Sequence, residues 1–190
     1  MGSDNSKTAI EWASRLTDGE ARNSFLSGMA SGIAQNSPEE AAKFVSGLPA
    51  GKTQDAAASS VVSQWASSDP QAAAAWVTSF PAGSTRDSAV RSVVSMWSNN
   101  DPKAASDWLG SLPADNVQQQ AAQTFVSQVS WQFPDIAATW AGKLSDETQR
   151  NYAIENVARQ WLEIDRKAAE SWLAQTSLPD DRKGRLLKGH

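Results

Sequence analysis

The sequence predicts an all-α fold, an α-solenoid built from stacked helical hairpins, on the strength of three observations. A step of 32 residues joins Pro70 to Pro102 and Trp76 to Trp108. Within each step, apolar residues recur at the i, i+3, i+4, i+7 spacing of one helix face. Proline stands at both ends of the first helix in three copies, those that begin at Pro38, Pro70 and Pro102. A hairpin with one apolar stripe on each helix cannot bury both stripes alone, so neighbouring hairpins must stack.

The first helix of each repeat is expected to begin where a short polar residue precedes proline, as at Asp69–Pro70. The polar side chain can cap free amides, and proline at the first helical position loses no hydrogen bond. Ala73, Trp76, Val77 and Phe80 then lie on one helix face. This pattern predicts a helix of about eleven residues.

The second helix of each repeat follows a short Ala-Gly turn. The first helix stops before Pro81, because proline biases the residue ahead of it away from helical geometry. Val90, Val93, Val94 and Trp97 then repeat the helical spacing. The two helices together form one predicted hairpin.

The repeats cover nearly the whole chain, in about five and a half copies. Where one second helix has Val129 in place of its late Trp, Phe125 appears four residues earlier, a compensation typical of a packed core. We expect residues 1–4 to be an N-terminal tail or an expression scar, and 5–190 to be a single domain. The repeats are 5–36, 37–68, 69–100, 101–132 and 133–164, with a partial copy at 165–190.

This plan resembles tetratricopeptide-type repeats, to which Sel1-like and pentatricopeptide repeats are related. The shared features are a Trp early in the first helix, apolar and small residues on the second, and proline opening the next hairpin. The chain departs from that family in its 32-residue period, against about 34, and in the Trp on its second helix. The resemblance implies a right-handed superhelix with a concave groove that binds peptides.

Composition excludes several classes of protein. The formal net charge of −4 argues against nucleic-acid binding, which needs a clustered positive surface. The chain has no Cys, so it has neither disulfides nor a thiolate zinc site. No apolar run approaches the roughly 20 residues of a membrane helix. The absence of Cys is compatible with any compartment, although many Ser, Asn and Gln and few Lys lean towards an extracellular or periplasmic protein.

Enzyme chemistry has little basis in this sequence. The one His is the terminal His190, and no Cys–His, Ser–His–Asp or metal-ligand spacing occurs. No Gly-rich loop opens a helix as a phosphate cradle. We therefore expect a non-enzymatic protein without catalytic, cofactor-binding or metal-binding residues.

A recurring polar pair opens the second helix of several repeats. It stands at Arg22–Asn23, Gln54–Asp55, Arg86–Asp87 and Arg150–Asn151. Such a ladder could recognise a ligand. The alternative is that it makes hydrogen bonds between repeats and caps helices.

One hairpin junction breaks the repeat pattern. Trp131 and Phe133 stand where another copy has Ser67 and Asp69. Two aromatic residues on a loop could form a contact site for another protein. Alternatively, Trp131 folds back to fill the space left by Val129.

The two ends of the array suggest self-association. Neither end shows the polar outer face that usually caps a solenoid, and an open end complements an open start. We therefore hypothesise a scaffold that associates head-to-tail with copies of itself into a filament or tube. The alternatives are a boundary within a longer repeat protein, and a monomeric adaptor that binds a partner in the groove. The expected self-association residues are Ile10, Trp12, Leu16, Trp172, Leu173, Leu178, Leu186 and Leu187.

Overall fold

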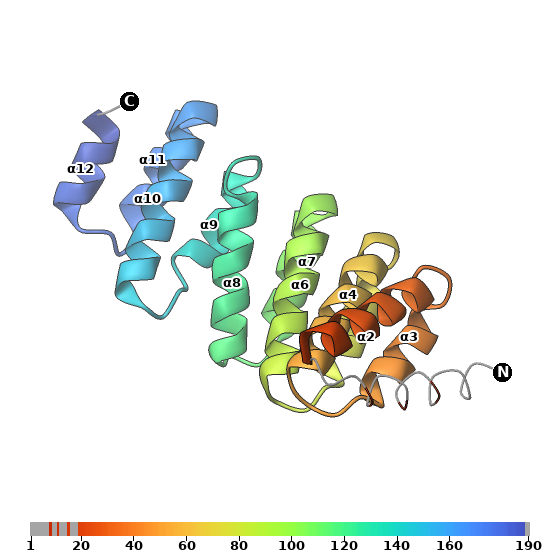
Figure 1. The fold of residues 1–190 in the computed structure, drawn as a ribbon. Coiled ribbons are helices and arrows are strands. Elements are labelled where there is room, and N and C mark those ends of the chain that lie inside the picture. The colour runs from red at the N-terminus through yellow and green to blue at the C-terminus, as the bar shows by residue number, and fades with distance from the viewer. Residues whose placement is uncertain (1–7, 9–10, 12–14, 16–18, 189–190) are drawn as a thin grey trace. The chain divides into compact units, whose positions relative to one another are not determined.

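The computed structural model of the chain is helical throughout the part that it describes, namely Thr8, Glu11, Arg15 and residues 19–188 (Figure 1). Eleven helices and no strand occur in that part. They are α2 (Gly19–Ala34), α3 (Pro38–Ser46), α4 (Lys52–Ser68), α5 (Pro70–Thr78), α6 (Ser84–Asn100), α7 (Pro102–Ser111), α8 (Asn116–Val129), α9 (Pro134–Ala141), α10 (Glu147–Ile164), α11 (Arg166–Gln175) and α12 (Asp180–Lys188). The all-α prediction is confirmed for these residues.

From α3 to α11, short and long helices alternate along the chain. The short helices α3, α5, α7, α9 and α11 have 8 to 10 residues. The long helices α4, α6, α8 and α10 have 14 to 18. Helices that follow one another pack together, α3 against α4 and α10 against α11 for example.

Aspartate caps fix the start of three short helices. The three side chains accept a hydrogen bond from the backbone amide three residues further on, which satisfies a free donor of the first turn. The bonds join Asp69 to Ala72, Asp101 to Ala104 and Asp165 to Ala168, at 2.9, 2.9 and 3.0 Å. The caps therefore confirm the predicted helix starts at these positions.

The turn between the two helices of a hairpin is built in two different ways. Gly51 and Gly83 have φ of 133° and 153°, a region that L side chains rarely adopt. At the equivalent place in the next repeat, Asp115 keeps a negative φ, and its side chain accepts from the amides of Val117 and Gln118. Either a glycine or a capping aspartate thus starts the second helix.

Contacts divide the chain into two compact units, Met1–Met96 and Trp97–His190, with the boundary inside α6. Each unit has its own buried core. In the first, the predicted core residues Val61, Val62 and Val90 are fully or almost fully buried. In the second, Phe125 and Ile154 have no exposed surface. Phe125 thus occupies the interior, as expected where Val129 replaces the late Trp.

A tryptophan near the end of a long helix stacks against one on the following short helix. The geometry recurs almost unchanged, which indicates that these repeats share one packing arrangement. The pairs are Trp65–Trp76, Trp97–Trp108 and Trp161–Trp172, with ring centroids 5.9, 5.9 and 5.7 Å apart and interplanar angles of 37°, 35° and 45°.

Trp140 departs from this arrangement because its partner position holds Val129. Its indole Nε1 instead donates to the Ser106 hydroxyl of the preceding short helix at 2.9 Å. The ring is buried, and Lys143 Nζ lies 5.0 Å from its centroid. Where the long helix has Val129, the indole of the next short helix thus bonds to the preceding short helix.

Candidate protein-interaction site

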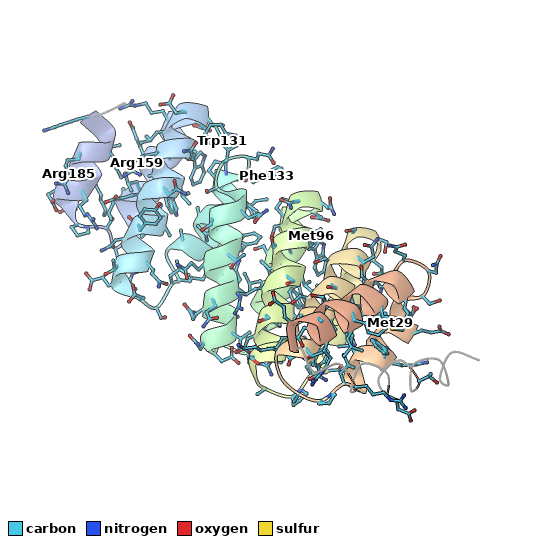
Figure 2. The ribbon with its side chains drawn as sticks, in the orientation of Figure 1. Met29, Met96, Trp131, Phe133, Arg159 and Arg185 are labelled. Carbon is cyan, nitrogen blue, oxygen red and sulfur yellow. The ribbon has the colours of Figure 1, made fainter. Side chains whose placement is uncertain are left out.

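Three of the four large apolar side chains that are exposed in the described part of the second unit lie at helix ends. Trp131 follows α8 and is 70% exposed, while Phe133 precedes α9 and is 37% exposed. Ile164, the last residue of α10, is 63% exposed. We call Trp131, Phe133 and Ile164 the corner patch. Figure 2 shows Trp131 and Phe133 at the junction of α8 and α9.

The corner patch spans two successive corners of the same unit. The first corner joins α8 to α9, and the second joins α10 to α11. α8 packs against α10, and both corners lie at the same end of these helices in Figure 1. Packed helices have axes about 8–10 Å apart. The two corners therefore lie about one helix spacing apart, with Trp131 and Phe133 at one and Ile164 at the other.

Backbone hydrogen bonds hold the first corner in place. The carbonyl of Val129 accepts from the amides of Gln132 at 3.2 Å and Phe133 at 2.8 Å. The buried hydroxyl of Ser130 accepts from Asn156 Nδ2 of α10 at 3.2 Å. Trp131 is thus presented on a fixed turn, which lowers the conformational entropy that a partner must remove on binding.

Phe133 occupies a position that usually stabilises a helix. It is the N-cap of α9, and no side-chain hydrogen bond caps that helix. Its backbone angles, φ −134° and ψ 62°, lie close to those of Asp101 in the equivalent place, φ −146° and ψ 84°. An aspartate at position 133 could therefore make the missing bond. Ser37, the N-cap of α3, likewise makes no side-chain cap bond.

Exposure decides between the two sequence-based alternatives for Trp131. A side chain that filled the space beside Val129 would be buried, whereas Trp131 is 70% exposed. Phe125 fills the interior instead. The structure thus excludes the second alternative, in which Trp131 folds back, and leaves this ring available for contact.

The predicted self-association residues lie in different environments. Ile10, Trp12 and Leu16 are outside the described residues. Leu173, Leu178 and Leu186 are buried within the chain's own C-terminal helices, so their side chains have almost no exposed surface to present to a copy. The reason is that α12 folds back on α10 and α11. Only Trp172 and Leu187 keep partial exposure among the C-terminal five.

Sequence reasoning missed Ile164, although the 32-residue register carried a signal. The equivalent positions Ser68, Asn100 and Gln132 are all polar. Tyr152 on α10, 69% exposed, likewise stands in a register of small and polar residues. An apolar residue at a repeat position that is polar in the other copies therefore signalled an exposed apolar side chain.

The polar pairs that open the long helices have structural partners. Gln54 and Arg150 of these pairs, and Gln118 at the equivalent place in α8, donate to backbone carbonyls at the end of the preceding short helix or in the turn after it, and so satisfy free acceptors. The acceptors are Val45 and Leu48 for Gln54, Leu109 and Leu112 for Gln118, and Leu144 and Ser145 for Arg150, at 2.8 to 3.2 Å.

The second member of the pair joins successive hairpins. The Asn23 side chain accepts from Thr53, and the Asp55 carboxylate accepts from Thr85 and from Ser84. The interpretation as helix caps and bonds between repeats is confirmed at these positions. These bonds account for Asn23, Gln54, Asp55 and Arg150 within the chain.

The described residues hold no cluster of three or more His, Cys, Asp or Glu that could bind a metal ion. None of the helices in the same part of the chain combines the length and apolar character needed to cross a bilayer. Comparison with protein-family models, curated proteins and solved structures finds no match to this chain.

Proposed function

We propose that this chain is a non-enzymatic repeat scaffold that mediates protein–protein association through the corner patch. In this proposal its helical hairpins stack as a tetratricopeptide-like, right-handed solenoid. The recurring Trp–Trp geometry supports regular stacking. So do the hydrogen bonds from Thr53 to Asn23 and from Thr85 to Asp55, which join equivalent positions of successive hairpins.

The observation that carries the proposal is the exposed Trp131 beside an uncapped helix start at Phe133. A capping residue at an N-cap contributes roughly 0.5–2 kcal/mol, and an exposed aromatic contributes little to folding. The residues at this corner therefore contribute less to folding stability than a capping residue would, and they leave apolar surface exposed to solvent. Loss of stability at a position with no folding role is typical of a surface kept for function.

The corner patch also has the composition of an interface centre. Trp is enriched among residues that dominate binding energy, and aromatic side chains supply rigid contact area. The fixed turn between Val129 and Phe133 supports preorganised binding. Single exposed apolar residues are common on protein surfaces, but three of them lie here on the two corners at one end of the packed helices α8 and α10.

Head-to-tail assembly into a filament is a separate form of association, which uses the ends of the array and not the corner patch. On the C-terminal side it now depends on Trp172 and Leu187, because the other three leucines are buried. Size-exclusion chromatography and negative-stain microscopy of the purified protein would show filaments or large oligomers. A monomer of 20.3 kDa at tens of micromolar would exclude the filament.

Site-specific photo-crosslinking tests the broader proposal. A photoreactive phenylalanine analogue replaces Trp131 in one variant and Tyr152 in a matched control, which is equally exposed but lies outside the patch. Irradiation is done both in the expressing cell and on purified protein. We expect protein adducts from position 131 and few from position 152. Equal adduct formation at the two positions, or none at either, would overturn the proposal.

A further inference from the structure

The charges around the corner patch are arranged one repeat apart and have opposite signs. Asp135 lies in the first turn of α9, two residues after Phe133. Lys167 lies at the equivalent place on α11, thirty-two residues later, next to the corner that carries Ile164. Both side chains are exposed. Among the described residues, neither has an ion-pair partner.

Two nearby charged residues, in contrast, already form ion pairs within the chain. Lys103, the equivalent residue on α7, already pairs with Asp107 on its own helix at 3.1 Å. Arg166, next to Lys167, pairs with Glu170 at 2.8 Å. Within the described part of the chain, the side chains of Asp135 and Lys167 are thus the exposed charged groups beside the patch that have neither an ion-pair nor a hydrogen-bond partner.

We propose that the partner of the corner patch is a second copy of this chain, bound through a two-fold contact; this inference depends on the proposed function of the patch. In a two-fold contact, both subunits use the same surface. If residue X of one subunit contacts residue Y of the other, then residue Y of the first subunit contacts residue X of the second. An antiparallel arrangement of two patches sets Asp135 against Lys167 of the partner subunit. The symmetry produces this pair twice.

The charges select the antiparallel arrangement over the parallel one. A parallel two-fold contact sets Asp135 against the same residue of the other copy, and Lys167 likewise, so both contacts are repulsive. The antiparallel contact makes both attractive and still buries Trp131, Phe133 and Ile164 between the copies. Opposite charges at the rim fix the register, while the apolar centre supplies the contact area.

The size of the patch sets the expected affinity. A stable interface buries about 1,200–2,000 Å² in total, and a large aromatic side chain covers about 150–250 Å². Three partly exposed side chains fall short of that range, even when both copies are counted. We therefore expect a reversible dimer with a dissociation constant of about a micromolar or weaker, not a permanent one.

Sedimentation equilibrium of the full chain with exchanged charges tests this contact. Asp135→Lys alone or Lys167→Asp alone sets like charges together at both ends of the interface. We expect each to weaken the dimer by about tenfold or more. The double variant, Asp135→Lys with Lys167→Asp, restores both pairs by symmetry and should return the dissociation constant to within about threefold of the parent value. Circular dichroism confirms that each variant is folded.

A matched control separates the pairing from a general effect of charge. Glu39 stands at the same repeat position on α3, in the other unit, and is exposed. Glu39→Lys changes the formal charge of −4 by the same amount as Asp135→Lys and should leave the dimer unchanged. No dimer at millimolar concentration, single variants without effect, or a double variant that fails to recover would each overturn the inference.

The outcome is distinguishable from failure of the proposed function. If the protein is monomeric but position 131 forms adducts with a different protein, the two-fold contact is wrong while the patch remains an interaction site. If the protein is monomeric and position 131 forms no adducts, both proposals are wrong.

Discussion

The indole rings of Trp97 and Trp108 stack with their centroids 5.9 Å apart, across the corner between α6 and α7. Trp97 is 5% exposed, in contrast to the 70% exposure of Trp131 further along the chain. Two tryptophans near equivalent helix ends thus do different things. Trp97 packs in the core at the corner between α6 and α7, whereas the side chain of Trp131 lies outside the core.

Truncation should separate these two roles. Trp97→Ala removes a buried ring and its partner contact, so we expect a loss of about 3–5 kcal/mol in the free energy of unfolding. Trp131→Ala should change it by less than about 1 kcal/mol, because little of that ring is buried on folding. Urea unfolding followed by circular dichroism measures both. A large loss for Trp131→Ala would mean that its ring supports the core.

The side-chain bonds of Gln118 should stabilise the hairpin of α7 and α8. Its Nε2 donates to the carbonyls of Leu109 at 3.1 Å and Leu112 at 3.0 Å, and the residue is buried. Gln118→Ala leaves two acceptors without this donor, so we expect a loss of about 1–3 kcal/mol. Gln123→Ala, at an exposed position of the same helix, should cost less than about 0.5 kcal/mol. Similar losses for the two variants would refute the capping role.

Two glycines of the first unit should respond to alanine with opposite signs. Gly83 has φ of 153° and open space where the methyl group of alanine would lie, so Gly83→Ala strains the backbone alone. We expect a loss of about 1–2 kcal/mol. Gly32 lies inside α2, also with open space, and Gly32→Ala should gain about 0.5–1 kcal/mol from helix propensity. Thermal unfolding of both variants checks the difference in sign.

Phe133→Asp should stabilise the chain. The equivalent Asp101 accepts from the amide of Ala104 at 2.9 Å, and the backbone at position 133 has similar angles. An added cap is worth about 0.5–2 kcal/mol, so the melting temperature should rise. Phe133→Asn is a second capping variant without the charge, and its melting temperature should rise in parallel. If both variants unfold at lower temperature, Phe133 contributes to packing and the argument from a missing cap fails.

The 32-residue register predicts much of the fold because each repeat carries its own local signals. The Asp caps at Asp69 and Asp101, the proline stops and the buried face of Val90 all follow from short-range sequence. Such signals depend on backbone chemistry and helix geometry, which act locally. The starts of these short helices could therefore be predicted before the structure.

The sequence predicted the candidate site only in part, because an apolar stripe on a helix does not show which other element packs over it. Leu173 and Leu178 resemble an open end in sequence, but α12 folds back and buries them within the chain. Trp131 fits core or surface equally well in sequence, and only its exposed fraction decides. Ile164 is aliphatic, so it lacks the aromatic signal that marks Trp131 and Phe133. Which apolar side chains lie outside depends on contacts between elements, which periodicity does not specify.

The central claim is that the corner patch is retained for association and not for folding. The most direct measurement is the yield of protein adducts from the photoreactive group at position 131, with and without Phe133→Asp. We predict that the substitution removes most of the adducts while the protein becomes more stable. An unchanged yield would contradict the claim, because association would then not depend on Phe133.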